Sequence, residues 1–282
     1  MHPLKKTLDT FYGEYNFKER VKHDPIEIPR RYSRPDDIEI AGFFASSLAY
    51  GKIGLFKPVI ERILKPGGRH PACFFKDFHL GRDKKYLQGI SYRFNKEEDI
   101  ICLVYMISHT LKKWGSLKNI FYHYYEPGHE DIKYALEKLV NYFMNIDTSP
   151  IYGKNIRPYG LKQFFPSPES GSACKRLNLF LRWMVRTKDI DLGIWNKIPP
   201  SKLIIPLDTH IARISRCLDL TKRKSSDWKT AREITDELKQ MNPGDPLKYD
   251  FALCHQGISG LCRGERFRSV CSSCAILGHL WP

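Results

Sequence analysis

The 282-residue sequence contains no run of about 18 apolar residues, the length that a membrane-spanning helix requires. Its first ten residues are polar and carry two lysines, so they lack the apolar core of a signal peptide. Strand patterns are scarce as well. The clearest is 203–206, and its terminal Pro206 argues against a central strand. These features exclude Rossmann and barrel folds, and they predict a protein of the cytoplasm with no membrane partner.

Acidic residues are outnumbered, since 31 Asp and Glu stand against 46 Lys and Arg, for a formal net charge of +15. The positive excess is spread along the chain and forms no basic tail. A folded protein with such a field attracts polyanions, of which nucleic acid is the commonest. A solvated basic surface without a specific partner explains the charge equally well. The charge therefore makes nucleic acid a candidate partner, and only the sequence motifs can distinguish this explanation from a solvated surface.

Apolar residues recur with helical spacing through most of the chain, which predicts an all-α fold of roughly ten helices with short links. One helix is expected to begin at Asp208, whose side chain would cap it. The other main helices are expected over 36–50, 55–65, 95–114, 131–146, 173–187, 227–241 and 245–257, and a loop over 147–172.

Several helix boundaries rest on single residues. Asn95 with Glu98 resembles a capping box, and Asp245 before Pro246 is a strong helix start. Pro58 is tolerable only in the first turn of its helix, because a proline further in removes a backbone hydrogen bond.

The first segment that carries candidate chemistry is Pro-Leu-Asp-Thr-His-Ile-Ala-Arg at 206–213. The carboxylate of Asp208 would face the free amide groups of the first helical turn, which stabilise its negative charge. An ionised carboxylate beside an apolar wall is suited to stabilising a cationic transition state or to orienting a water molecule. A plain helix cap is the alternative, and spacing alone favours it.

The second segment is Gly-Ser-Ala-Cys-Lys-Arg at 171–176, a turn that leads into a helix. Amide groups at such a helix start bind phosphate well. Lys175 lies in the first turn next to Arg176, and a lysine in a positive field is a usable amine nucleophile. A solvated basic face is the alternative here.

Together these segments resemble the helix-hairpin-helix (HhH-GPD) DNA glycosylase superfamily. The run at 206–213 is similar to the Val-Asp-Thr-His-Ile-x-Arg element of endonuclease III and its relatives, which implies that Asp208 is the catalytic aspartate. Gly171 and Lys175 keep the family spacing Gly-x-x-x-Lys, since 175 − 171 = 4. The resemblance implies that Lys175 forms a Schiff base with the deoxyribose, and that both side chains face one nucleotide-sized cleft.

The resemblance extends over about residues 37–274, and its other motifs are weaker. The sequence also resembles a bacterial branch that shares the Ser-Ala-Cys-Lys-Arg-Leu-Asn and Pro-Leu-Asp-x-His blocks. The segment 43–51 resembles the buried early helix and its end, and 92–94 resembles the Gly-Tyr/Phe-Arg turn. The resemblance implies a set of DNA-binding residues: Tyr50, Lys52, Arg93, Gly171, Ser172, Arg176, His210 and Arg213.

It also implies one bilobal catalytic unit over 1–282. A central helical lobe would span 37–202 with its hairpin near 159–187, and 1–36 with 203–282 would form a second lobe that carries a cysteine tail at 254–274.

Two departures from the family pattern bear on the substrate. The separation from Lys175 to Asp208 is 208 − 175 = 33, longer than in endonuclease III, with the insertion over 187–203. The archaeal 8-oxoguanine glycosylases also have a long separation, which favours an oxidised purine as the base removed. The hairpin reads Pro-Ser-Pro-Glu-Ser-Gly at 166–171 in place of Leu-Pro-Gly-x-Gly, so its turn should differ.

Eight cysteines raise the question of a metal. Cys271 and Cys274 have the Cys-x2-Cys spacing of metal ligands, and with Cys262 they resemble the iron–sulfur cysteines of the family. The fourth ligand would have to come from elsewhere, and the candidates are Cys254, His255 and His279. Because three ligands do not close a structural site, we expect free thiols and no cofactor, with an iron–sulfur cluster or zinc as the alternative.

The sequence therefore predicts a monomeric DNA base-excision repair glycosylase with AP lyase activity, acting on a damaged base in double-stranded DNA. One alternative keeps the fold but not the chemistry: a non-catalytic nucleic-acid-binding protein in which Asp208 is a cap and Lys175 a phosphate contact. A metal-stabilised interaction protein built around the cysteine tail is the second alternative.

Overall fold

The computed structural model describes residues 2–259, 271 and 274–276, and these residues form helices and loops without a β-strand. The α-helices are α1 (Lys5–Gly13), α2 (Phe17–Val21), α3 (Pro35–Ser47), α4 (Ile53–Leu64), α5 (Pro71–Asp77), α6 (Leu80–Asp83), α7 (Glu97–Trp114), α8 (Leu117–Tyr124), α9 (Lys133–Asn145), α10 (Ser149–Tyr152), α11 (Tyr159–Lys162), α12 (Lys175–Val185), α13 (Thr209–Cys217), α14 (Trp228–Met241) and α15 (Asp250–Ile258). Short 3-10 turns lie at Pro25–Glu27, Pro29–Arg31, Lys65–Gly67, Lys84–Leu87 and Pro200–Lys202. The predicted all-α class is confirmed.

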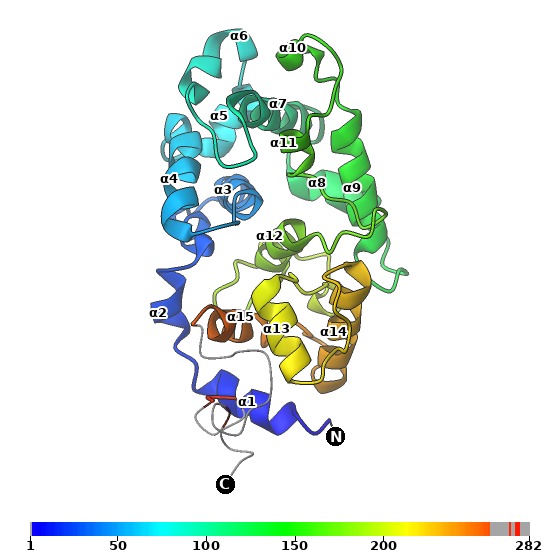
Figure 1. Cartoon of the computed structure of the whole chain (residues 1–282). Coiled ribbons are helices and arrows are strands. Elements are labelled where there is room, and N and C mark those ends of the chain that lie inside the picture. Colours follow the sequence, from blue (N-terminus) through cyan, green and yellow to red (C-terminus); the bar gives the residue numbers. More distant parts are fainter. Residues whose placement is uncertain (1, 260–270, 272–273, 277–282) are drawn as a thin grey trace.

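The helices form two groups along the long axis of the molecule (Figure 1). Helices α3 to α11 lie in the upper half of the view, and α1, α13, α14 and α15 lie in the lower half, with α12 between them. Helix α12 therefore stands where the two groups meet, and its N-terminal end carries Lys175.

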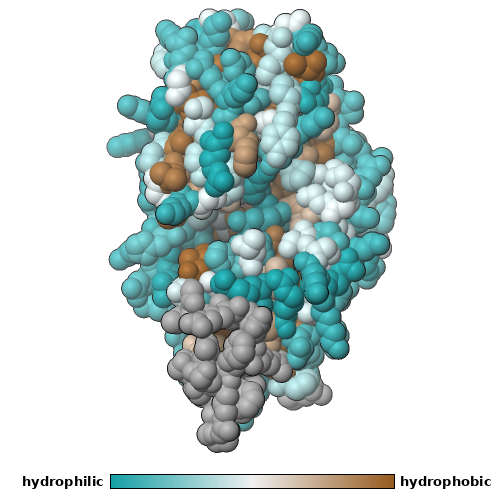
Figure 2. Space-filling view, in the orientation of Figure 1, coloured by the Kyte–Doolittle hydropathy of each residue, from teal (hydrophilic) through white to brown (hydrophobic). Residues whose placement is uncertain are grey.

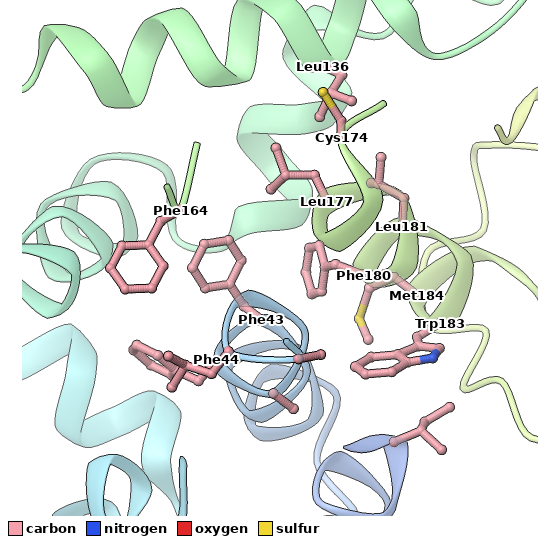
Figure 3. Close-up of a cluster of buried hydrophobic side chains, with 14 of the residues drawn as sticks. Phe43, Phe44, Leu136, Phe164, Cys174, Leu177, Phe180, Leu181, Trp183 and Met184 are labelled. Carbon is pink, nitrogen blue, oxygen red and sulfur yellow. The ribbon is translucent and has the colours of Figure 1, made fainter. Parts of the chain in front are cut away.

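The packing of α3 against α12 forms the centre of the molecule (Figure 3). Nearly every residue of α3 is buried, and the ring of Phe43 meets Phe180 of α12 edge-on with 5.5 Å between centroids. Gly42 permits this close approach, because a Cβ there would lie 2.9 Å from Cε of Met184. The apolar face of α12 thus fixes the helix that presents Lys175.

Several expected helix boundaries differ from those of the structure. Helix α4 begins at Ile53, so Pro58 lies beyond its first turn and inside the helix. Helix α7 begins at Glu97, and Asp99 rather than Glu98 accepts the hydrogen bond from the backbone N–H of Lys96, at 2.9 Å.

Asn95 is buried instead of capping α7, and its side-chain amide donates to the carbonyl of Gly160 at 2.6 Å. Asp245 does not open α15, since its carboxylate binds the guanidinium of Arg186 with two contacts of 2.8 Å, and the helix begins at Asp250. The expected loop over 147–172 also contains the short helices α10 and α11.

No helix within the described part of the chain is both long and apolar enough to cross a bilayer. The face shown in Figure 2 is mostly hydrophilic, with apolar residues scattered over it.

Candidate active site

The hairpin between α11 and α12 contains a tight turn, in which the N–H of Gly171 donates to the carbonyl of Pro168 at 2.9 Å. Gly171 has φ +80° and Cys174 has φ +49°, so the chain enters the left-handed region twice before α12 begins. The hairpin is fixed to α14, because the N–H of Trp228 donates to the carbonyl of Gly171 at 2.9 Å and Ser172 forms a bridge with Asp227. Among the residues that the structure describes, no side chain caps the N-terminus of α12, which leaves its first-turn amides available to an anion.

Asp208 is the N-cap of α13, as its position in the sequence predicts. Its Oδ1 accepts hydrogen bonds from the N–H groups of His210 and Ile211 at 2.9 and 2.8 Å. The preceding segment 203–207 is buried, which fixes the backbone that leads into the cap. The cap occupies one carboxylate oxygen, so Oδ2 is left to face the rest of the site.

That second oxygen meets Lys175. The Nζ of Lys175 lies 3.7 Å from Oδ2 of Asp208, and it also donates to the carbonyl of Ala49 at 3.2 Å, at the end of α3. The side chain of Lys175 is 33% exposed and that of Asp208 is 14% exposed, so solvent reaches both. The two side chains therefore lie in contact, whereas the resemblance implied that they face each other across a nucleotide-sized cleft, and at this distance no nucleotide fits between them.

A third group completes the cluster. The Sγ of Cys254, on α15, lies 3.7 Å from the same Oδ2 of Asp208. Burial raises the pKa of the Cys254 thiol well above its ordinary value, and the negative charges of Asp208 and Asp250 act in the same direction. The thiol therefore keeps its proton. The sequence had suggested Cys254 as a metal ligand, and nothing local to it indicates a partner 46 residues away.

Arg176 turns inward from the start of α12. Its guanidinium donates to the carbonyl of Ser47 at 2.8 Å and to the carbonyl of Gln163, and it lies 5.1 Å from the centre of the Tyr50 ring. Burial lowers the pKa of Arg176, and among the described residues no carboxylate lies within ion-pair distance of it. Arg176 thus joins the ends of α3 and α11 next to Lys175, and its predicted contact with DNA stays a prediction.

Tyr50 and Arg93 lie next to Arg176, since the guanidinium groups of Arg93 and Arg176 both face the Tyr50 ring. The hydroxyl of Tyr50 donates to the carbonyl of Tyr92 at 3.0 Å. Arg93 is exposed, has φ +50°, and holds its guanidinium 5.8 and 5.5 Å from the rings of Tyr50 and Phe94. Lys52 is exposed at the N-cap of α4. Tyr50 and Arg93 therefore place a basic and aromatic surface near Lys175, which donates to the carbonyl of the neighbouring Ala49.

His210 and Arg213 hold α13 to α15. Gly257 packs directly on His210, and Nη2 of Arg213 donates to the carbonyl of Gly257 at 2.6 Å. Their place at a helix–helix contact was not expected from the sequence, which suggested DNA contacts. The contact brings α15, and with it Cys254, against the first turn of α13.

The cysteine tail is described only in part. Cys262 lies outside the described residues, while Cys271 is buried and Cys274 is partly buried, with the N–H of Cys274 donating to the carbonyl of Cys271 at 3.1 Å. Within the described ranges, no three His, Cys, Asp or Glu side chains are grouped so as to hold a metal ion. The described residues alone therefore do not assemble a ligand set.

Surface hollows of about 540, 500, 230 and 220 Å³ are lined by residues other than Lys175 and Asp208. The chemistry that the chain offers therefore lies at the contact between α12 and α13, outside these four hollows.

The fold and this cluster define an all-helical protein with a lysine–aspartate pair at the junction of its two helical groups. The chain belongs to the family described as proteins of unknown function (DUF2400), whose model matches residues 24–259. No curated protein and no solved structure matches the chain significantly.

Proposed function

We propose that this protein is a DNA glycosylase with AP lyase activity, which removes a damaged base, an oxidised purine in the first instance, from double-stranded DNA. The observation that carries the proposal is the meeting of the Lys175 amine and the Asp208 carboxylate at 3.7 Å, both partly exposed, from segments 33 residues apart. The resemblance of both segments to the helix-hairpin-helix glycosylases assigns the same two residues. We further propose that the protein acts as a monomer in the cytoplasm.

The proposed reaction begins with rotation of the damaged nucleotide out of the duplex and between the two side chains. As the bond from C1′ to the base nitrogen breaks, its electron pair leaves with the base, and Asp208 stabilises the positive charge that develops on the sugar. The amine of Lys175 forms the new bond to C1′. Because the departing base needs one proton and the lysine ammonium has to lose one, the two transfers balance. The lysine nitrogen of this adduct then loses a second proton, which passes to O4′ as the C1′–O4′ bond opens, and the Schiff base is formed. Loss of a proton from C2′ of the Schiff base expels the 3′-phosphate and cuts the strand.

Binding would rest on the positive field of the chain, which has a formal net charge of +15. The uncapped N-terminus of α12 and the exposed side chains of Arg93 and Lys52 would hold phosphates of one strand. Affinity should therefore fall steeply as salt concentration rises.

The test is a panel of lesion-bearing duplex oligonucleotides scored for base release, nicking and borohydride trapping. We expect Lys175→Gln to abolish trapping, and Asp208→Asn to remove base release while DNA binding persists. Lys162→Gln, which changes an exposed lysine at the end of α11, is the control for loss of one positive charge. Ser116→Ala is the control for loss of a helix cap, because the Ser116 side chain accepts the N–H of Asn119 at the start of α8.

If the wild-type protein neither releases a base nor traps on any lesion, the proposal is wrong. Unchanged excision by Asp208→Asn would remove Asp208 from the mechanism even if activity were found.

A non-catalytic nucleic-acid-binding protein is the second candidate. The contacts of Lys175 favour this candidate. Its ammonium group contacts both Asp208 and the Ala49 carbonyl, as expected for a lysine whose role is to hold helices together. A salt-dependent shift of DNA without base release would support this candidate.

A further inference from the structure

The thiol of Cys254 is a group next to the candidate active site that the proposed reaction does not use. It comes from α15, whereas Lys175 comes from α12 and Asp208 from the cap of α13. The three elements converge on one atom, Oδ2 of Asp208, with 3.7 Å to the lysine nitrogen and 3.7 Å to the cysteine sulfur. Oδ1 is already occupied by two backbone N–H groups.

The direction of this contact follows from the protonation of the thiol. Burial among carboxylates raises the pKa of Cys254 well above its ordinary value, so the sulfur carries its hydrogen. A carboxylate has no hydrogen to donate and accepts one readily. The S–H group therefore donates and Oδ2 accepts, and the same protonation keeps the sulfur from competing with Lys175 as a nucleophile, because the thiolate is the reactive form.

The packing of α15 explains why the thiol is held there. Cys254 and Gly257 are three residues apart, so they share one face of α15. Gly257 lies so close to α13 that a Cβ at this position would be 2.8 Å from Cβ of His210. Four residues before Cys254, Asp250 is bound to the buried guanidinium of Arg182 with 2.5 Å between oxygen and nitrogen. These two contacts fix the helix on both sides of the cysteine.

We infer that Cys254 is a positioning residue, which holds Oδ2 of Asp208 by a thiol hydrogen bond while Lys175 moves away to attack the sugar. This inference rests on the proposed function. In the resting protein the carboxylate has two partners at Oδ2, and when the lysine leaves, the thiol is the partner that remains. The carboxylate then keeps its orientation toward the developing positive charge.

The first experiment does not depend on activity. The side-chain carboxyl carbon of Asp208 is followed by NMR across pH in the whole protein, with Asp208→Asn used to assign the signal. In Cys254→Ala the titration midpoint should move to higher pH, because the charged form has lost a donor. Cys254→Ser keeps a donor and should stay close to wild type. Cys102→Ala, which removes another buried thiol from α7, is the control.

The second experiment uses single-turnover base release. We expect Cys254→Ala to slow the chemical step about 10-fold with DNA affinity unchanged, which is the range that loss of one hydrogen bond to a charged group produces. Its acid limb should move to higher pH, and Cys254→Ser should restore most of the rate.

The outcomes separate the two claims. Identical Asp208 titrations in wild type and Cys254→Ala would overturn the hydrogen bond, whatever the activity. A shifted titration together with equal rates and equal pH profiles would overturn the positioning role. A shifted titration in a protein that releases no base would support the contact and contradict the proposed function.

Discussion

Replacement of Gly257 by alanine tests whether the contact between α13 and α15 sets the geometry of the candidate site. A Cβ at this position would lie 2.8 Å from Cβ of His210, 3.3 Å from its Cα and 3.3 Å from Cδ1 of Ile214. Carbon atoms in contact prefer separations of about 3.5–4.0 Å, so the helices have to separate by roughly 1 Å. Two of the three opposing atoms are Cα and Cβ of His210, which a rotation of the side chain cannot move away.

The magnitude follows from two opposing effects. Alanine in place of glycine inside a helix stabilises by up to about 1 kcal/mol, while an overpacked contact costs about 1–3 kcal/mol. We expect a net loss of about 1–2 kcal/mol in the free energy of unfolding, and more if Arg213 loses its 2.6 Å bond to the Gly257 carbonyl. Gly54→Ala is the matched control, because this glycine of α4 has no atom within 4 Å of an added Cβ, and it should stabilise the protein.

The free energy of unfolding of both variants is measured by urea titration with circular dichroism as the signal. The rate of base release measures the effect on the candidate site. Since Cys254 lies on the face that would be displaced, Gly257→Ala should also lower the rate of base release, and Gly54→Ala should not. If both glycine variants changed the stability in the same direction and by the same amount, the packing argument would be refuted.

Two further predictions concern buried charge. Glu39 accepts hydrogen bonds from the N–H groups of Leu117 and Lys118 and from Nε1 of Trp195, and burial raises its pKa from 4.5 to about 7. The folded protein thus binds this proton more tightly than the unfolded chain, so the contribution of Glu39 to stability is largest below about pH 4.5 and falls by roughly 3 kcal/mol as the pH rises to about 7. In urea titrations across this range, Glu39→Gln should show a smaller decrease than wild type, and parallel curves would contradict the assignment. Asp191→Asn leaves buried Arg182 and Arg186 without the carboxylate they share, so it should cost about 3–5 kcal/mol in the same assay, against less than 1 kcal/mol for exposed Asp236→Asn.

Much of the fold was predictable because apolar periodicity is a local property. The apolar face of 131–146 predicted both ends of α9 to within two residues, and that of 227–241 predicted both ends of α14 to within one. The errors lie where a polar residue that looks like a cap is used by a distant partner. Asp245 binds Arg186, which is 59 residues away, and Asn95 binds Gly160, which is 65 residues away. Local propensity cannot register such contacts.

The candidate site divides in the same way. The capping role of Asp208 was predictable from its place before an amphipathic helix, and it is confirmed. The approach of Lys175 to Asp208 could be expected only through the resemblance, since no periodicity relates residues that far apart. Cys254 was missed because a cysteine near other cysteines suggests a metal, whereas its partner in the fold is a carboxylate on another helix.

The resting distance between Lys175 and Asp208 has a consequence for how such a site would work. Two unit charges about 4 Å apart attract by about 1 kcal/mol in water and about 4 kcal/mol near a protein surface, so admitting a nucleotide at this 3.7 Å contact requires work of that order. The base itself contributes little binding free energy until it is bound between the two side chains. The work therefore has to come from contacts made elsewhere on the strand. Phosphates held at the start of α12 and by the surrounding basic side chains would supply it, which means that an isolated nucleoside should neither open the pair nor react.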